Sequence, residues 1–165
     1  MALSNGGKAQ EFTLKTTTGK TVVLSELMKR GPVVLAFFKV SCPTCQYAFP
    51  YFERMSQLHK PEAATILGIS QNNASETQAF MQQYGVTFPV AIDDSKKYIV
   101  SNAYKLTTVP TAYLVDRDGK IQVSSVGWTR RDIEEINAKL SMMDPAQQQH
   151  PLFKPGEEVA EYKAG

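Results

Sequence analysis

Apolar and polar positions alternate early in the chain, and continuous apolar runs follow. The alternating stretches 11–17 and 21–24 flank Thr18-Gly19-Lys20, and this pattern predicts a β-hairpin. The runs 33–38 and 65–69 are apolar and composed of β-prone residues. Such runs are typical of strands that are buried on both faces of a sheet.

Helical spacing and capping residues alternate with further strand patterns in the rest of the chain. Ser25 is the predicted N-cap of a short helix, and Ser75 with Gln78 three residues later forms a capping-box pattern. Pro50 lies inside a longer helix that we expect to begin at Pro43 and to kink. The predicted helices span 26–30, 43–59, 75–84, a segment ending at 103 and 130–141, and the later strands span 88–92, 111–115 and 121–126.

This order of elements predicts an α/β fold with a central sheet flanked by helices and an N-terminal β-hairpin. We expect residues 1–143 to form one domain, because no repeat or linker interrupts them. Residues 144–165 differ, since they hold three prolines, a Gln147-Gln148-Gln149 run and few apolar residues. They are predicted to be a C-terminal extension that packs on the domain or at an interface.

Composition and charge exclude several classes of function. The 165 residues are 42% apolar and 21% charged, which is typical of a globular domain. The net charge of +2 and the absence of a basic run disfavour a nucleic-acid partner. The longest apolar run, 33–38, is too short to span a membrane, and residues 1–10 do not form a leader. We therefore expect a cytoplasmic protein, or an exported or membrane-anchored one if a leader precedes this sequence.

The chain has two cysteines, Cys42 and Cys45, and their position predicts redox chemistry. They directly follow the buried run 33–38, and Pro43 suits the first position of a helix, which makes Cys42 its N-cap. Free N–H groups and the helix dipole at this position favour a thiolate, so we expect Cys42 to be the nucleophile. Cys45 lies one helical turn further on, is more buried, and resolves the mixed disulfide.

Two other uses of the cysteine pair compete with this interpretation. A structural zinc site needs four ligands, and His59 and His150 lie at unsuitable spacings. A Cu(I)-binding metallochaperone remains an alternative, because soft thiolates select Cu(I). A bridge across so short a loop would stabilise the fold little, so stability does not explain the pair. We predict no metal site.

Four motifs carry a family resemblance: Cys-Pro-Thr-Cys at 42–45, Thr-Val-Pro-Thr at 108–111, Asp-Arg-Asp-Gly at 116–119 and Gly127. Together they resemble thioredoxin-like proteins of the TlpA type, which are related to the alkyl hydroperoxide reductase/thiol-specific antioxidant family. The resemblance covers about residues 11–140 and includes the family's insertion of a helix and a strand, here between Asn72 and Ile92. It implies a thioredoxin-like α/β fold with a central mixed sheet and a central α/β insertion.

The resemblance also implies an activity and the residues that perform it. It implies a thiol–disulfide oxidoreductase with an antioxidant role in cell redox homeostasis, in which Cys42 and Cys45 exchange a redox-active disulfide beside a cis Pro110. We expect the Val109 backbone, Pro43 and Thr44 to contact the substrate, a protein or small-molecule disulfide or thiol. We also expect an electron donor or acceptor, which the sequence does not identify, and a monomeric or weakly dimeric protein. The resemblance implies no bound cofactor.

The sequence departs from the family pattern at groups that handle protons. Ser41 stands where a tryptophan is common, Ala48 replaces a frequent glutamate, and Ala36 replaces the buried carboxylate of thioredoxins. Lys39 is a candidate for tuning the thiolate, although a solvated lysine at the edge of the site is the simpler interpretation.

The remaining alternative is a peroxiredoxin-like thiol peroxidase with Cys42 as the peroxidatic cysteine. Residues 40–44 are similar to the Val-Cys-Pro-Thr stretch of those enzymes, but Lys39 stands where they have a threonine. The arginine that such an enzyme requires would have to be Arg117, Arg130 or Arg131.

Overall fold

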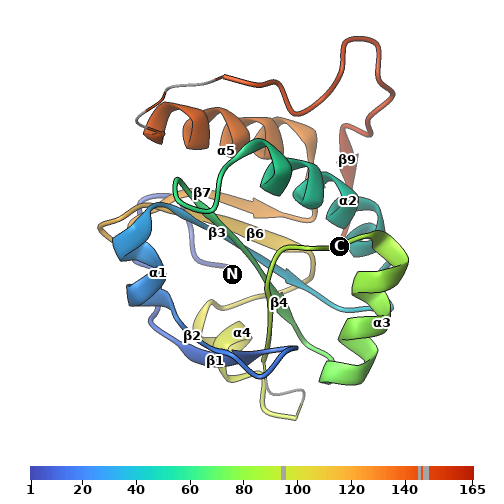
Figure 1. Cartoon of the computed structure of the whole chain (residues 1–165). Coiled ribbons are helices and arrows are strands. Elements are labelled where there is room, and N and C mark those ends of the chain that lie inside the picture. Colours follow the sequence, from blue (N-terminus) through green and yellow to red (C-terminus); the bar gives the residue numbers. More distant parts are fainter. Residues whose placement is uncertain (94–95, 145, 147–148) are drawn as a thin grey trace.

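A mixed sheet forms the centre of the molecule (Figure 1). The computed structural model describes residues 1–93, 96–144, 146 and 149–165. Within these residues, seven strands form one sheet in the order β2-β1-β5-β4-β3-β6-β7. The strands are β1 (Thr13–Thr16), β2 (Thr21–Val23), β3 (Val33–Phe38), β4 (Thr65–Ser70), β5 (Val90–Ile92), β6 (Thr111–Val115) and β7 (Ile121–Val126).

Strands β3, β4 and β5 are parallel to one another, and the other neighbouring pairs are antiparallel. The predicted N-terminal hairpin is β1–β2, which extends the sheet beyond β5. The predicted α/β class with a central mixed sheet is therefore confirmed. The predicted insertion corresponds to α3 and β5.

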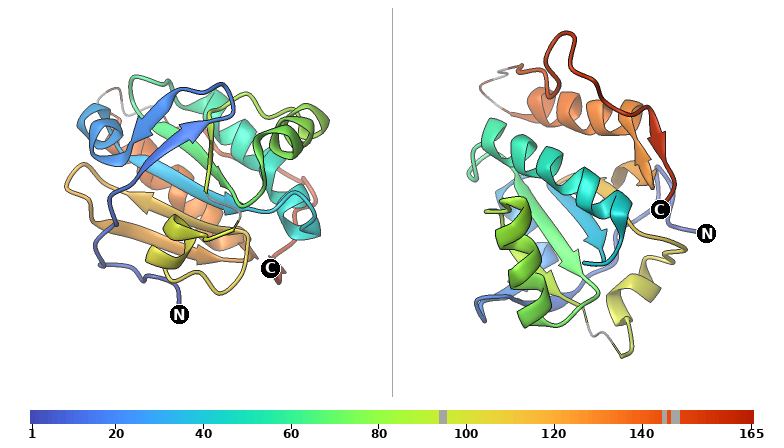
Figure 2. Two further views of the ribbon diagram at one scale, coloured as in Figure 1. Left: turned by 90° about the horizontal axis from the view of Figure 1, so that it is seen from below. Right: turned by 90° about the vertical axis from the view of Figure 1, so that its right-hand side faces the viewer.

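Helices cover both faces of this sheet (Figure 2). Side chains of α2, α3 and α5 pack into one apolar cluster, and side chains of α1 and of the residue after α4 pack into a second cluster on the other face. The helices are α1 (Leu24–Arg30), α2 (Pro43–Leu58), α3 (Ala74–Tyr84), α4 (Ile99–Ala103) and α5 (Arg130–Met143).

The central strand β3 belongs to both clusters because successive side chains of a strand point to opposite faces. Val34, Ala36 and Phe38 join the cluster beneath α2, whereas Val33, Leu35 and Phe37 join the other. All six residues are fully buried. The continuous apolar run of β3 is thus explained by burial on both faces, as predicted.

Two predicted helix starts were wrong. Helix α1 begins at Leu24, before Ser25, and its N-cap Val23 has no capping side chain. Helix α3 is capped by Asn73, whose side-chain oxygen accepts the Glu76 N–H at 2.8 Å. Asparagine caps as well as serine does, and Asn73 already has the extended backbone that an N-cap requires.

The C-terminal extension packs against α2 and α5 along most of its described length. Leu152 and Phe153 are buried in the cluster beneath α2. The Arg54 guanidinium makes two hydrogen bonds, of 2.8 and 3.0 Å, to the Glu157 carboxylate, and these hold the pKa of Glu157 at about 2. Residues 145, 147 and 148 lie outside the described residues. The boundary at residue 143 between a domain and an extension stays a prediction.

A further pair of short strands joins the extension to the body of the protein. Strand β8 (Trp128–Thr129) pairs antiparallel with β9 (Tyr162–Lys163). In Figure 1 the red extension passes over α5 and then descends to the N-terminal end of α2. Within the described part of the chain, no helix combines the length and apolar character needed to cross a membrane.

We expect Leu152→Ala to lower the free energy of unfolding by about 2–3 kcal/mol, because truncating a buried leucine loses transfer energy and leaves a cavity. Leu152 is only 3% exposed, so it is as buried as the other residues of the hydrophobic core. Urea unfolding followed by circular dichroism measures the change. Glu158→Ala, on an exposed residue of the same extension, is the matched control and should shift stability by less than about 0.5 kcal/mol. Equal stability of the two variants would mean that the extension adds nothing to the fold.

Candidate active site

The two cysteines lie where the central strand leads into α2. Strand β3 ends at Phe38, and Cys42 is the N-cap of the helix, with an extended backbone (φ −83°, ψ 114°). Its sulfur accepts the Cys45 backbone N–H at 3.0 Å, and Pro43 occupies the first turn. A sulfur atom therefore takes the place of the side-chain oxygen that commonly caps a helix.

The two thiols differ in their exposure and in their surroundings. Cys42 is partly exposed, whereas Cys45 is fully buried, and both are free thiols. Burial raises the pKa of the Cys45 thiol well above its ordinary value, and the adjacent Cys42 raises it further. Cys45 therefore stays protonated at neutral pH, and Cys42 is the sulfur that a substrate can reach.

A loop before β6 completes the site. The Cys42 thiol lies 3.5 Å from the Val109 carbonyl oxygen, to which it donates a hydrogen bond across 67 positions of sequence. The Val109–Pro110 peptide bond is cis. Pairing of Thr111 with Phe37 in β3 carries this loop to the start of α2.

The structure brings together the residues that we predicted for the site. Cys42, Cys45 and Val109 are in contact as described above. Thr44 is buried, and its hydroxyl donates a 2.6 Å hydrogen bond to the Ala164 carbonyl oxygen. Pro43 is exposed beside Cys42.

Two participants were not predicted. Gly127 donates its N–H to the Pro110 carbonyl oxygen at 2.8 Å, and Ala164 comes from the distant C-terminal extension. A small residue at 127 was visible in the sequence as part of the resemblance, but its contact with Pro110 was not. No pattern in the sequence predicts that the extension returns to the cysteines.

Alanines surround Cys45 at positions 36 and 48, where proteins of the resembling type commonly carry a carboxylate. Ala36 and Ala48 are fully buried in the same cluster as Cys45. Lys39, the candidate for tuning the thiolate, places its ammonium 5.5 Å from the centre of the Tyr98 ring. This contact fits the simpler interpretation of Lys39 as a partly solvated residue.

Two of the three arginines considered for a peroxidase site make other contacts, and the third, Arg131, is exposed. Arg117 donates to the Arg30 carbonyl oxygen at 3.3 Å, and Arg130 pairs with Glu134 at 2.8 Å. Neither of these hydrogen bonds involves a cysteine. Among the residues that the structure describes, no three His, Cys, Asp or Glu side chains lie together so as to hold a metal ion.

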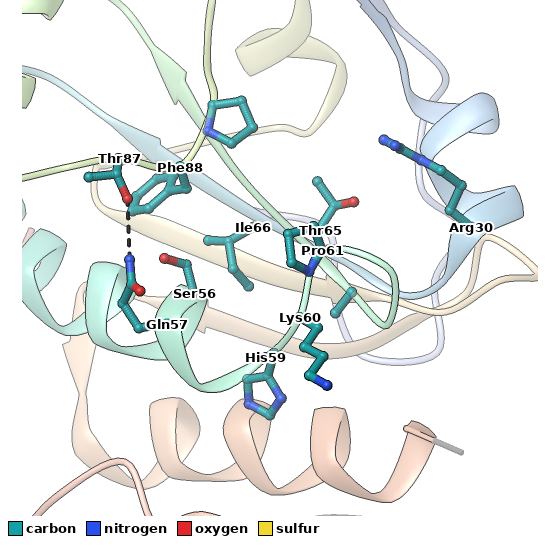
Figure 3. Close-up of a pocket in the computed structure, with 12 residues that line it drawn as sticks. Arg30, Ser56, Gln57, His59, Lys60, Pro61, Thr65, Ile66, Thr87 and Phe88 are labelled. Atoms are coloured by element: carbon teal, nitrogen blue, oxygen red, sulfur yellow. Dashed lines mark hydrogen bonds between the residues drawn. The ribbon is translucent and has the colours of Figure 1, made fainter. Parts of the chain in front are cut away.

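A separate cavity of about 490 Å³ lies at the far end of α2 (Figure 3). His59 and Lys60, which follow α2, line it together with Thr65 at the start of β4. Its wall includes a 3.3 Å hydrogen bond between Gln57 and Thr87. The 16 residues of α2 separate this cavity from Cys42 by about 24 Å, so it does not belong to the dithiol site.

Comparisons with known proteins agree with this geometry. Residues 5–124 match the model of the AhpC/TSA family. The thiol-disulfide oxidoreductase ResA of Bacillus subtilis is 32% identical over 121 residues, which are 73% of this chain and 66% of that protein. ResA of Halalkalibacterium halodurans is 33% identical over 133 residues, which are 79% of this chain and 74% of that protein.

A solved structure supports the fold. A proposed protein disulfide isomerase from Bacteroides thetaiotaomicron superposes with a TM-score of 0.76 at 27% identity, covering 87% of this chain and 94% of that one. The mixed sheet and the Cys42–Cys45 pair at a helix start define a thioredoxin-like thiol–disulfide oxidoreductase of the TlpA type. The chain belongs to the AhpC/TSA family.

We expect iodoacetamide to alkylate the reduced protein once per chain at neutral pH, on Cys42. Alkylation requires a thiolate, and Cys45 is both buried and held as a thiol by its raised pKa. Mass spectrometry of the intact chain and of its peptides counts and locates the label. In urea both cysteines should react, which controls for reagent activity. Comparable labelling of Cys45 in the folded protein would contradict the burial described here.

Proposed function

We propose that Cys42 is the nucleophile of disulfide exchange and that Cys45 is the resolving cysteine. The Cys42 thiolate attacks one sulfur of a substrate disulfide, forms a mixed disulfide and expels the other sulfur as a thiolate. The Cys45 thiol then loses its proton and attacks the Cys42 sulfur. This second step forms the Cys42–Cys45 disulfide and releases the first substrate sulfur as a thiolate.

The complete cycle transfers two electrons from the protein to the substrate, and the two substrate thiolates take up two protons. Run in reverse, the same steps oxidise a substrate dithiol. The observation that carries the proposal is the contrast between the two sulfurs. One is partly exposed at a helix N-cap, and the other is buried one turn further along the same helix.

We also propose that a substrate chain lies in an extended conformation beside Val109. A backbone next to a reactive sulfur offers hydrogen-bonding groups to any polypeptide, so it binds many sequences. The proximity of the Val109 carbonyl to the Cys42 sulfur supports this placement. Thr44, with a hydroxyl that donates to a backbone carbonyl, and the exposed Pro43 are the further proposed substrate contacts.

We also propose that the protein exchanges electrons with a redox partner. A separate electron donor or acceptor must regenerate the dithiol or the disulfide, since each cycle consumes one of them. The monomeric or weakly dimeric state, the cytoplasmic location and the antioxidant role stay predictions.

We expect Cys42→Ser to abolish reduction of insulin by dithiothreitol-reduced protein, because the attacking sulfur is lost. Cys45→Ser should accumulate a mixed disulfide at Cys42, because nothing resolves it. Non-reducing mass spectrometry detects the adduct, which dithiothreitol should reverse. Full activity of Cys42→Ser would overturn the proposed mechanism.

The alternatives are separated by two further measurements on the wild-type reduced protein. Stopped-flow oxidation by hydrogen peroxide should be slow compared with oxidation by a protein disulfide. Rapid, saturable oxidation by peroxide would instead support the thiol peroxidase. Protection of Cys42 from alkylation when stoichiometric Cu(I) is added to the folded protein would support the metallochaperone.

A further inference from the structure

The last residues of the extension cross the surface beside the reactive cysteine. We call residues 162–165 the covering segment. Shortly before it, the Ala160 carbonyl accepts the Trp128 indole N–H at 2.7 Å, and the Ala160 N–H donates to the Tyr47 hydroxyl at 2.9 Å. Strand β9 then pairs with β8, opposite Trp128 and Thr129. The segment is thus guided along one edge of the site.

Beyond β9 the segment reaches the dithiol itself. The Ala164 carbonyl accepts the Thr44 hydroxyl one residue before Cys45. Gly165 lies so close to Val109 that a Cβ at position 165 would overlap the Val109 carbonyl oxygen. This is the oxygen that accepts the Cys42 thiol hydrogen bond. The segment therefore occupies the place beside Val109 that we proposed for a substrate backbone.

The site is shaped to let a polypeptide backbone approach closely. Gly127 has a positive φ of 71°, and a Cβ there would lie 2.8 Å from the Lys163 carbonyl oxygen. The segment presents only small residues, Ala164 and Gly165, where it lies nearest to Val109. Beside the cysteines, the segment accepts the Thr44 hydrogen bond through a backbone carbonyl, a group that any substrate chain also carries.

The attachment of the extension is strong upstream and weak at the covering segment. Upstream, Leu152 and Phe153 are buried and Arg54 pairs with Glu157. Just before the segment, the Glu161 carbonyl accepts the Arg130 N–H at 2.9 Å and its carboxylate lies 3.6 Å from the Arg130 guanidinium. Residues 162–165 themselves are exposed and are held by a two-residue ladder, the Thr44 hydrogen bond and a contact of the Lys163 ammonium 4.8 Å from the Tyr47 ring centre. Exposed backbone pairing of this kind opens locally without global unfolding.

We propose that residues 162–165 occupy the position of a polypeptide substrate and that such a substrate must displace them before its disulfide reaches Cys42. This proposal rests on the disulfide-exchange role proposed above. The segment acts as a competitor tethered to the same chain, and the upstream anchor keeps it near the site after displacement. Small disulfides do not need the place beside Val109, because Cys42 and Pro43 remain accessible. The segment thereby determines which substrates react.

We expect the segment to slow the reaction with polypeptide disulfides and to leave the reaction with small disulfides nearly unchanged. If the binding-competent form is a small fraction of the population, the apparent affinity for a polypeptide falls by that fraction. Deletion of residues 162–165 should raise the second-order rate constant for oxidation of the reduced protein by insulin about tenfold. The rate constant with oxidised glutathione should change by less than about twofold, because that disulfide does not compete for the same place.

Two variants and a control make this comparison specific. Gly165→Leu keeps the full chain but places a side chain against Val109. Its Cβ would lie only 2.6 Å from the Thr108 hydroxyl oxygen. It should therefore accelerate the insulin reaction as the deletion does. Glu158→Ala, on an exposed residue upstream, should leave both rate constants unchanged.

The possible results separate this proposal from the proposed function. An unchanged or lower insulin rate in both variants, with Cys42→Ser still inactive, would overturn the role of the segment and leave the exchange mechanism standing. An equal increase with both disulfides would overturn the claimed selectivity. Failure of the intact reduced chain to react with either disulfide would overturn the exchange mechanism and this proposal with it.

Hydrogen exchange tests the displacement directly, without any change to the segment. Cys45→Ser is trapped through Cys42 as a mixed disulfide with a polypeptide or, separately, with glutathione. The polypeptide adduct should show faster amide exchange in residues 162–165 than the glutathione adduct, while exchange in residues 150–157 should be the same in both. Equal protection of residues 162–165 in the two adducts would contradict displacement.

Discussion

The hydrogen bond from the Cys45 N–H to the Cys42 sulfur ties the reactive atom to the first turn of α2. A helix N-terminus has free N–H groups that need partners, and here one of those partners is the nucleophile. Strand β3 fixes where this turn lies, since it is buried on both faces and paired with β4 and β6. The position of Cys42 is therefore a property of the sheet and the helix together.

The same arrangement separates the roles of the two sulfurs. Cys42 caps the helix at the surface, and Cys45, one turn on, faces the apolar cluster beneath α2. Burial, with a further contribution from the adjacent Cys42, raises the pKa of Cys45 and keeps its thiol protonated. The alanines at 36 and 48 leave this environment without the carboxylates that relatives of this type commonly carry.

The C-terminal extension adds a second level of organisation to this site. The family match ends at residue 124, and the extension lies beyond it. Its anchor is built from buried side chains and an ion pair, whereas its contacts near Cys42 come from backbone atoms. A segment attached in this way binds the site without competing chemically for the sulfur, because it contains no cysteine. In the proposed arrangement, residues 162–165 control the binding of polypeptide substrates, whereas Cys42 and Cys45 carry out the disulfide exchange.

Local patterns in the sequence were sufficient for the class of fold, the strand–helix junction and the cysteine pair. Hydrophobic periodicity, Pro43 and the spacing of Cys42 and Cys45 depend on neighbours within a few residues, which the sequence displays. The start of α3 was missed because Asn73 caps a helix as well as Ser75 does. The start of α1 at Leu24 was missed because its N-cap, Val23, has no capping side chain that the sequence could display. The family resemblance, and no local pattern, placed Val109 and Pro110 near Cys42, and the tertiary structure alone decided that Ala164 lies on Thr44. The Cys42–Val109 and Thr44–Ala164 pairs are 67 and 120 positions apart, and only strand pairing and the packing of the extension bring them into contact.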